Sequence, residues 1–427
     1  MNLTRRQLLK AGALGLAAPV AGAALTTEQA QELPESFKEL RPLGDRVRPI
    51  TTEEFQQRVT QAQRLMRESK PRFAAVYLAP GSSLYYYAGI RWSGGERLFS
   101  LVIPATGEPL VVCPAFEEGR ARELLRWPME VRVWQEDESP YAVVARWLAE
   151  RGVRTGRIGV EETMRFQFFD GLRKAAASLN YASADPITAG CRMRKTEHEL
   201  ELMRLANHAT VDVYRAVFAA LREGLTEREV RNLISQGFQK MGLSGGALVL
   251  FGQWAALPHG TTKPQKLQEG EGVLIDGGTS VEGYASDVTR CTVLGKPSEK
   301  LQRAFETVRR AQDAALEAAR TGRTCGSVDD AARQVVVGAG YGKGYELFTH
   351  RLGHGIGLDG HEHPYLVRGN KIVLQPGMTF SNEPGIYVKG EYGLRLEDIM
   401  AIRADGPAEL LTPSFSPSLE NPCAKQQ

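Results

Sequence analysis

The residues best suited to chemistry in this 427-residue chain begin with two aspartates in its C-terminal half. The segment 272–295 has the pattern of two strands joined by a turn near Val281 to Gly283, and Asp276 and Asp287 flank that turn. An even-membered loop would place the two aspartates directly opposite each other, with Cβ atoms about 4.5 to 5.5 Å apart. At about 4 Å and an effective dielectric near 20, their repulsion is roughly 4 kcal/mol, so we expect a cation or a proton between them.

A second acidic pair repeats this arrangement in the segment 381–399. Glu383 and Glu397 are centred on Gly390 and would face each other across an odd-membered loop. A single acid is most often a solvated surface residue or a turn former. Because both pairs have apolar neighbours, such as Ile275 and Leu396, we favour a buried cluster of four carboxylates.

A glycine-rich stretch, residues 349–366, holds four of the seven histidines, namely His350, His354, His361 and His363. Its glycines predict a loop whose backbone passes close to another group, rather than a helix. His259 lies in another predicted turn. His198 and His208 fall on a predicted long helix and are interpreted as surface or hydrogen-bonded histidines, and His363 receives no role.

Four carboxylates with one or two imidazoles form a hard, oxygen-rich ligand set that suits manganese, cobalt, iron or zinc. Two divalent cations would balance the four negative charges, and a bridging water would complete such a site. We therefore expect two divalent metal ions per chain, with manganese first and cobalt, zinc or iron as alternatives.

The ordered set Asp276, Asp287, His354, Glu383 and Glu397 resembles the five-ligand signature of the pita-bread metallopeptidases, the family of methionine aminopeptidase, aminopeptidase P and prolidase. The resemblance covers about residues 190–405. The segment RMRKTEHELELMRLAN, residues 192–207, resembles the opening of the catalytic domain in the proline-specific branch. The implied fold is an α/β N-terminal domain of the creatinase type followed by an α+β pita-bread catalytic domain.

The resemblance also implies roles. Asp276 would bind one metal, His354 and Glu383 the other, and Asp287 and Glu397 both. His259 and His361 would contact substrate and the developing tetrahedral centre, His350 would lie at the wall of the pocket, and Arg395 would orient a bridging carboxylate.

In the implied reaction, a water bridging two cations attacks the carbonyl of the first residue. Glu383 moves the proton and His361 stabilises the oxyanion. The implied substrates are short peptides with proline in second position, cut as by an aminopeptidase or a dipeptidase, and the implied assembly is a homodimer.

Three other classes compete with this interpretation. A non-catalytic pita-bread peptide-binding module or a metal-free creatinase-like C–N hydrolase would use the same fold, but the intact acid set argues against both. A methionine aminopeptidase would normally lack the large N-terminal domain and an export signal.

Alternating strand and helix patterns between residues 73 and 184 predict an α/β unit. A long amphipathic helix is expected from Lys195 to about Leu221, and Thr226 with Glu229 forms a capping box for the next helix. The predicted division is a twin-arginine-like signal peptide at 1–26, a linker at 27–50, a creatinase-type domain at 51–190, the catalytic domain at 191–412 and a tail at 413–427.

The N-terminus has a basic start with Arg5, Arg6 and Lys10, followed by a short apolar run. This pattern predicts export to the periplasm or outside the cell by the twin-arginine pathway, with no membrane span in the mature protein. Because residues 1–23 contain those three basic residues and no acidic one, the net charge of +3 falls to zero without them. A neutral remainder gives no electrostatic reason to expect nucleic acid as a partner.

The five cysteines, Cys113, Cys191, Cys291, Cys325 and Cys423, are odd in number and lack CxxC spacing. This argues against a zinc knuckle and a disulfide framework. Most are expected to be small buried side chains, and one disulfide stays open.

Overall fold

The computed structural model of the protein describes residues 33–413 and 415–424, so the predicted signal peptide at 1–26 lies outside the described residues. No helix in the described part of the chain is both long and apolar enough to cross a membrane.

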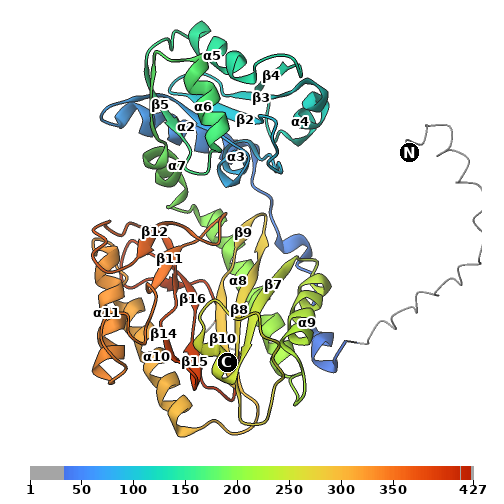
Figure 1. Ribbon diagram of the computed structural model, residues 1–427, viewed down its shortest axis with the longest axis vertical. Helices are drawn as coiled ribbons and strands as arrows, with labels where there is room; N and C mark the ends of the chain where they lie inside the picture. Colours follow the sequence, from blue (N-terminus) through green and yellow to red (C-terminus); the bar gives the residue numbers. More distant parts are fainter. Residues whose placement is uncertain (1–32, 414, 425–427) are drawn as a thin grey trace, which may run out of the picture. The chain divides into compact units, whose positions relative to one another are not determined.

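The first domain is built around a six-stranded mixed sheet with the strand order β4-β3-β2-β1-β5-β6 (Figure 1). Strand β1 pairs antiparallel with β2 and parallel with β5, so the sheet is mixed at its centre. The bounds are β1 Phe73–Leu78, β2 Ser100–Pro104, β3 Leu110–Pro114, β4 Glu130–Trp134, β5 Gly156–Val160 and β6 Leu179–Ser183. The predicted α/β unit is therefore confirmed.

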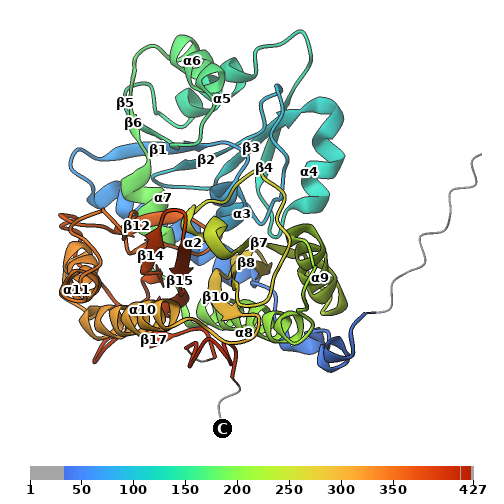
Figure 2. The same cartoon turned by 60° about the horizontal axis from the view of Figure 1, so that its bottom comes forward.

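Helices cover both faces of this sheet. Helices α5 and α6 lie on one side, and α2, α3 and α7 lie on the other (Figures 1 and 2). Their bounds are α2 Thr52–Glu68, α3 Ser82–Ala88, α4 Glu118–Leu124, α5 Pro140–Glu150, α6 Phe166–Ala175 and α7 Asp185–Arg192, with a 3₁₀ turn η3 at Ala115–Glu117. Fully buried side chains such as Tyr77, Trp147 and Leu172 fill the space between sheet and helices.

The second domain contains two curved sheets and four long helices. One sheet has the order β10-β8-β7 with β9 paired to β8, and the other has the order β12-β11-β13-β16-β17. A separate ribbon consists of β14 and β15. The strand bounds are β7 Gly245–Phe251, β8 Gly272–Val281, β9 Tyr284–Ala285, β10 Val288–Val293, β11 Gly353–Gly355, β12 Glu362–Leu366, β13 Thr379–Asn382, β14 Gly385–Val388, β15 Tyr392–Arg395, β16 Asp398–Ala401 and β17 Glu409–Leu410.

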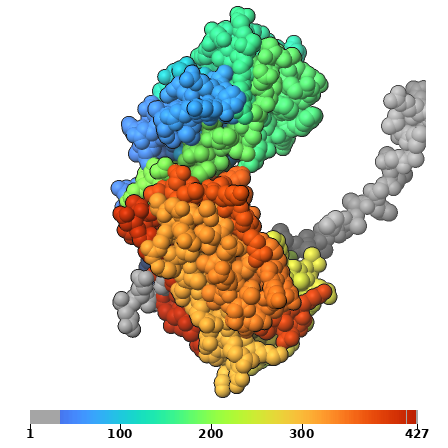
Figure 3. Space-filling model, turned by 90° about the vertical axis from the view of Figure 1, so that its left-hand side faces the viewer, coloured from blue at the N-terminus to red at the C-terminus, as the bar shows by residue number. Residues whose placement is uncertain are grey.

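The helices of this domain pack as pairs against the sheets. Helices α8 (Glu197–Phe218) and α9 (Glu227–Lys240) contact β7 and β8, whereas α10 (Glu299–Ala318) and α11 (Cys325–Gly338) contact the strands from β12 to β15. The outer surface of α10 and α11, coloured orange, forms much of the face in Figure 3. The predicted capping box at Thr226 and Glu229 begins α9. A backbone bridge between Thr289 and Glu397 joins the two sheets at the point where the acids lie.

The segments at both ends of the second domain are packed rather than extended. Within the predicted linker, the 3₁₀ turns η1 (Glu35–Glu39) and η2 (Gly44–Arg46) form, and Phe37 is fully buried. Near the C-terminus Leu419 and Cys423 are buried, and Arg215 of α8 donates a hydrogen bond to the Cys423 carbonyl.

Buried ion pairs connect the first domain to the strands that carry candidate site residues. Arg58 of α2 donates to Glu199 Oε1 at 2.8 Å and to the Tyr284 hydroxyl at 2.7 Å. Arg192 and Lys195 both donate to Glu362, the residue that follows His361, at 2.5 Å. These contacts fix the positions of β9 and β12, the strands next to Asp287 and His361.

All five cysteines are buried and free, and none forms a disulfide in the described residues. Burial raises the pKa of the Cys291 and Cys325 thiols to about 12. The expectation of small buried side chains is confirmed.

Candidate metal centre

The first acidic pair lies on the β8–β9–β10 hairpin, whose register differs from the predicted one. Glu282 and Gly283 form a two-residue turn with φ of +50° and +88°, as in a type I′ hairpin. This turn is centred one residue later than a pairing of Asp276 with Asp287 requires, so Asp276 pairs with Thr289. The prediction that the two aspartates lie directly opposite each other is therefore wrong. They are diagonal neighbours on one face, and both still reach the same cluster.

The second acidic pair has the predicted register. Asn382 pairs with Asp398, and Gly385 pairs with Arg395. Both pairs are symmetric about Gly390. Glu383 and Glu397 fall at matching positions between these pairs. The odd-membered loop predicted from the sequence is confirmed.

His354 lies on β11, although the sequence predicted a loop there. Strands β11 and β12 are short and pair His354 with Tyr365. The glycines are needed because a Cβ at Gly353 would lie 2.0 Å from the Ser381 carbonyl oxygen. The prediction that this backbone passes close to another group is confirmed, but that group is a neighbouring strand.

The His354 ring is aimed at the acids. Its Nδ1 lies 3.1 Å from the Gly355 carbonyl oxygen, which fixes the proton on Nδ1. Its Nε2 lies 3.3 Å from Glu383 Oε1, 3.8 Å from Asp287 Oδ2 and 3.9 Å from Glu397 Oε1. A histidine that donates from one nitrogen to a carbonyl and presents the other to acids has the geometry of a metal ligand.

The five predicted ligands come together in two overlapping groups, in each of which one ligand atom per residue lies within 4.8 Å of the others. One group is His354, Glu383 and Glu397, and the other is Asp276, Asp287 and Glu397. A further group joins Asp287, His354 and His361. Glu397 is shared by the first two groups, as a carboxylate between two cations would be.

Burial and mutual repulsion raise the proton affinity of three of the acids. Burial, together with the charges of neighbouring acids, holds the pKa of Asp287 and Glu397 well above the ordinary range. Burial also raises the pKa of Glu383 to about 7. Asp276 differs: burial alone would raise its pKa, but Arg395 and the Thr289 hydroxyl outweigh burial and hold the pKa below its usual value.

The residues present fit a pair of divalent cations. Glu397 Oε1 is buried and has no hydrogen-bond partner in the described structure. Four ionised carboxylates carry a charge of −4, and Arg395 is the one basic side chain within ion-pair distance of Asp276 among the described residues. An orphaned carboxylate oxygen inside an excess of buried negative charge is expected where a cation binds.

Arg395 was predicted to orient a bridging carboxylate, but the carboxylate that it contacts is Asp276, which was assigned to one metal only. Its Nη2 donates to Asp276 Oδ2 at 2.5 Å, and its Nη1 donates to the Tyr387 hydroxyl at 2.8 Å. The Tyr387 hydroxyl in turn lies 2.7 Å from His350 Nε2. Because His350 Nδ1 faces the Arg351 carbonyl at 2.7 Å, Nε2 is the acceptor from Tyr387. Burial and Arg395 lower the pKa of His350 to about 3, so this ring is neutral.

The predicted substrate-contacting histidines lie at the rim. The exposed His361 ring stacks on His354 with centroids 3.7 Å apart. Burial, Arg351 and His259 lower the pKa of His361. His259 is exposed on the loop after η4 (Gly252–Ala256), within electrostatic range of both His350 and His361.

The remaining histidines lie apart from the cluster. His198 is hydrogen-bonded to Glu54 and to the Arg48 carbonyl, as expected of a structural histidine. His363 lies 3.5 Å from Glu162 Oε2 and forms a separate group with Glu162 and Asp185.

Two hydroxyl residues at the centre were missed by the sequence interpretation. The Thr289 hydroxyl lies 2.5 Å from Asp276 Oδ1 and 2.8 Å from Glu397 Oε2. The Ser381 hydroxyl accepts from the His354 backbone amide and donates to Glu383 Oε1 at 3.1 Å. The sequence did hold a signal for these two residues. Each lies two residues from a predicted ligand, and side chains two residues apart in a strand point to the same face.

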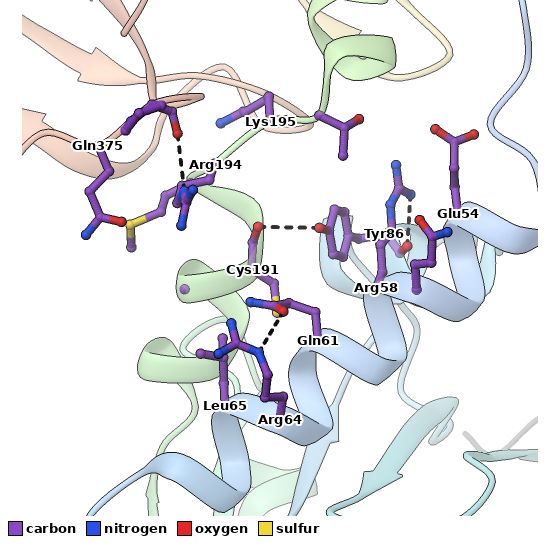
Figure 4. Close-up of a pocket in the computed structure, with 15 residues that line it drawn as sticks. Glu54, Arg58, Gln61, Arg64, Leu65, Tyr86, Cys191, Arg194, Lys195 and Gln375 are labelled. Atoms are coloured by element: carbon purple, nitrogen blue, oxygen red, sulfur yellow. Dashed lines mark hydrogen bonds between the residues drawn. The ribbon is translucent and has the colours of Figure 1, made fainter. Parts of the chain in front are cut away.

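A surface pocket of about 630 Å³ lies elsewhere, lined by α2, the α7–α8 junction and Gln375 (Figure 4). Arg58 donates to the Tyr86 carbonyl, Arg64 to Gln61, and Arg194 to the Pro376 carbonyl. None of the predicted ligands lines this pocket, so it is distinct from the acidic cluster.

Comparison with known proteins agrees with this geometry. Residues 201–404 match the description "Metallopeptidase family M24", and residues 58–194 match "Creatinase/Prolidase N-terminal domain". The chain is 38% identical over 338 residues to the "Probable dipeptidase PepE" of Mycobacterium tuberculosis, covering 78% of this chain and 88% of that protein. It is 36% identical over 338 residues to the Xaa-Pro dipeptidase of Lactobacillus delbrueckii subsp. lactis, covering 77% of this chain and 90% of that protein.

A solved structure shares the whole two-domain fold. The crystal structure of the dipeptidase PepE from Mycobacterium ulcerans superposes with a TM-score of 0.79 at 34% identity, covering 86% of this chain and 98% of that chain. The chain belongs to metallopeptidase family M24 and carries the creatinase-type N-terminal domain of its prolidase branch. It is an enzyme of that family, and the predicted fold class is confirmed.

The same comparisons correct the predicted location. The prediction of a periplasmic or extracellular protein exported by the twin-arginine pathway is wrong, because the dipeptidase and prolidase relatives that define this chain's family give no support for export. A basic start followed by a short apolar run is a pattern of composition and does not by itself make a signal.

Proposed function

We propose that this protein is a dinuclear metallopeptidase that hydrolyses the bond between an N-terminal residue and a following proline. The observation that carries the proposal is the convergence of Asp276, Asp287, His354, Glu383 and Glu397 on one buried cluster. Relatives named dipeptidase and Xaa-Pro dipeptidase, aligned over most of their length, support the choice of substrate.

In this proposal Asp276 would hold one cation, His354 and Glu383 would hold the other, and Asp287 and Glu397 would contact both. Bound cations supply a low-pKa water and polarise the peptide carbonyl. Manganese is the ion we propose first, because the ligand set has four carboxylates and one imidazole.

The side chains of the chain itself supply proton transfer and orientation. Glu383, whose side chain lies among the proposed metal ligands, would accept and return a proton during catalysis. His361, neutral at the exposed rim, donates a hydrogen bond to the carbonyl oxygen of the substrate. Neutral His350 and exposed His259 line the wall beside it, and Arg395 holds Asp276 in place.

The test combines metal analysis with a substrate series. Purified protein should contain close to two divalent ions per chain, lose activity when they are stripped, and regain it best with manganese. Ala-Pro should be cleaved faster than Ala-Ala. Full activity of exhaustively stripped protein would contradict the metal assignment, and faster cleavage of Ala-Ala would contradict the proline specificity.

We also propose that the protein assembles as a homodimer, as the family resemblance implies. Light scattering coupled to gel filtration measures this directly, and a mass of one chain would contradict it.

A further inference from the structure

His361 lies at the end of a short loop, residues 356–361, that joins β11 to β12. The backbone amide of Gly357 donates to the Asp359 carbonyl at 3.0 Å, and the Ala285 amide of β9 donates to the Gly357 carbonyl at 2.8 Å. Both hydrogen bonds hold the start of the loop, whereas Gly360 and His361 at its end are exposed. The position of His361 therefore depends largely on the side chains that flank it.

One arginine binds both of the acidic side chains that flank His361. The Arg192 Nη2 atom donates to Asp359 Oδ2 and to Glu362 Oε2, each at 2.5 Å. Asp359 precedes His361 by two residues, and Glu362 follows it directly. Ser82, the first residue of α3, also donates to Asp359 Oδ1. Because Arg192 is the last residue of α7, both groups that bind Asp359 belong to the first domain.

Most of this network is shielded from water. Lys195 donates to Glu362 Oε1 at 2.5 Å, and the side chains of Arg192, Glu362 and Lys195 are 12%, 8% and 2% exposed respectively. Burial removes hydration that the attraction between the charges offsets only in part, so such ion pairs add little net stability. They do restrict geometry, because a buried carboxylate that moved away from its partners would lose their compensation. The network is therefore suited to fixing the position of the loop.

The group that this network positions is the His361 ring. The ring stacks on His354 with centroids 3.7 Å apart, at the edge of the acidic cluster. In the proposed function His361 donates a hydrogen bond to the substrate carbonyl. A reacting or stabilising group that is misplaced by about 1 Å can lower the rate by about a hundredfold.

We propose that Arg192 is a positioning residue for His361, and that it connects the loop carrying this histidine to the first domain through Asp359 and Glu362. The inference rests on the proposed function, since it takes His361 as the donor to the substrate carbonyl. Arg192 itself touches neither the predicted ligands nor the substrate in this proposal, so its effect on turnover passes through His361.

The experiment combines Arg192→Met with His361→Ala in a double-mutant cycle on Ala-Pro. Methionine keeps an apolar stem at this position but cannot bind either carboxylate. Alone, Arg192→Met should lower kcat by roughly ten- to a hundredfold and change KM by less than about threefold, with the metal ions still bound. In the His361→Ala background the same change should lower kcat by less than about threefold, because the ring that Arg192 positions is already absent.

Two further variants keep the test decisive if Arg192→Met folds poorly. Asp359→Asn weakens one contact of Arg192 at a side chain that is 45% exposed, and it should lower kcat by about three- to tenfold. Arg192→Lys keeps the charge but cannot reproduce the guanidinium geometry, so it should retain part of the kcat that Arg192→Met loses.

Arg204→Met is the matched control. Arg204 on α8 also joins two acids, Glu197 at 2.7 Å and Glu409 at 2.8 Å, and its side chain is partly buried. Neither of these acids flanks His361. Arg204→Met should therefore leave kcat near the wild-type value, even if it lowers thermal stability.

The outcomes separate this inference from the proposed function. Wild-type kcat in both Arg192→Met and Asp359→Asn would overturn the inference. An equal loss of kcat from Arg192→Met with and without the His361 ring would also overturn it, because the effect would then not pass through His361. If wild-type protein with two bound ions does not cleave Ala-Pro, or if His361→Ala alone keeps full kcat, the proposed function or its assignment of His361 fails first, and the inference fails with it.

Discussion

The two hairpins that carry the acids reach the same cluster by different backbone routes. In the β8–β9–β10 hairpin a two-residue turn makes Asp276 and Asp287 diagonal neighbours, and Thr289 fills the position opposite Asp276. In the β13–β16 hairpin a three-residue loop keeps Glu383 and Glu397 at matching positions. The residue opposite Asp276 is therefore a threonine, whose hydroxyl contacts Asp276 and Glu397, whereas in the Glu hairpin the two acids themselves hold the matching positions. This difference teaches that turn type, rather than the spacing of two acids, decides which residues face each other.

The largest test of this comparison removes one acid from each hairpin. Asp287→Ala and Glu397→Ala should each lose bound metal and lower kcat/KM by about a thousandfold or more, because several kcal/mol of charge stabilisation in the transition state comes from the cations. Metal stoichiometry and kinetics on the two variants measure this. An Asp287→Ala protein that keeps two ions would limit the shared role to Glu397.

A second test separates the ligands from the rim. His361→Ala should keep its metals and lose roughly two to three powers of ten in kcat, about the loss of one oxyanion donor. His354→Ala should lose metal, since this ring has three carboxylates within 4 Å. If His361→Ala were the variant that lost metal, the roles of the two stacked histidines would have to be exchanged.

The hydroxyls sharpen the comparison further. Thr289→Val removes a group that contacts one acid of each hairpin, so metal affinity or activity should fall by about ten- to a hundredfold. Ser381→Ala removes a contact to Glu383 alone and should cost less. Metal titrations measure the affinity of both variants. A larger effect of Ser381→Ala would mean that the Ser381 contact to Glu383 matters more for metal binding than the Thr289 contacts.

The turns of the two hairpins should contribute modestly to the stability of the folded protein. Gly283→Ala and Gly390→Ala each force a residue with a side chain into a left-handed conformation, with φ of +88° and +80°, at a cost of about 1 to 2 kcal/mol. Gly283→Ala should cost more, because its Cβ would lie 2.7 Å from Arg91 Nη2, whereas a Cβ at Gly390 meets nothing within 4 Å. Urea unfolding of the two metal-free variants checks the order, and equal costs would show that Arg91 moves away freely.

The smallest expected effect is the pH dependence of stability without metal. Because Asp287, Glu383 and Glu397 have raised pKa values, the folded protein holds protons that the unfolded chain releases, so stability falls as pH rises through the folded pKa values. Above about pH 7.5, where the buried histidines are neutral in both the folded and the unfolded state, Tm of stripped protein should drop by a few degrees toward about pH 8.5.

Added metal should reverse this trend, because the ligands bind it in the deprotonated state. The rise in Tm on adding manganese should therefore be greater at about pH 8.5 than at about pH 7.5. If Tm of the metal-free protein rose with pH over this range, the folded state would not bind more protons at these acids than the unfolded chain does.

The sequence predicted which acids and which histidine gather in one cluster, but it did not predict their neighbours, and the two hairpins show why. A symmetric three-residue loop preserves the register that simple counting gives, so the position of Glu383 opposite Glu397 was predictable. The Glu282–Gly283 turn shifts the register by one residue, and no residue count reveals that shift. Thr289, Ser381 and Tyr387 are ordinary polar side chains in strands, so their contacts appear only once tertiary pairing is known.

The five buried thiols allow local unfolding of each domain to be measured by chemical labelling. Cys113 and Cys191 lie in the first domain, and Cys291, Cys325 and Cys423 lie in the second, all inaccessible in the folded state. The Cys291 thiol on β10 lies 3.2 Å from the Arg395 carbonyl oxygen on β15. This contact joins the Asp hairpin to the strand that carries Arg395. Since a thiol reacts as the exposed thiolate, the rate at which a labelling reagent modifies Cys291 measures how often the metal-binding strands separate. Bound metal should slow the labelling of Cys291 more than that of Cys113. The two rates therefore compare local unfolding of the second domain with that of the first domain in the same molecule.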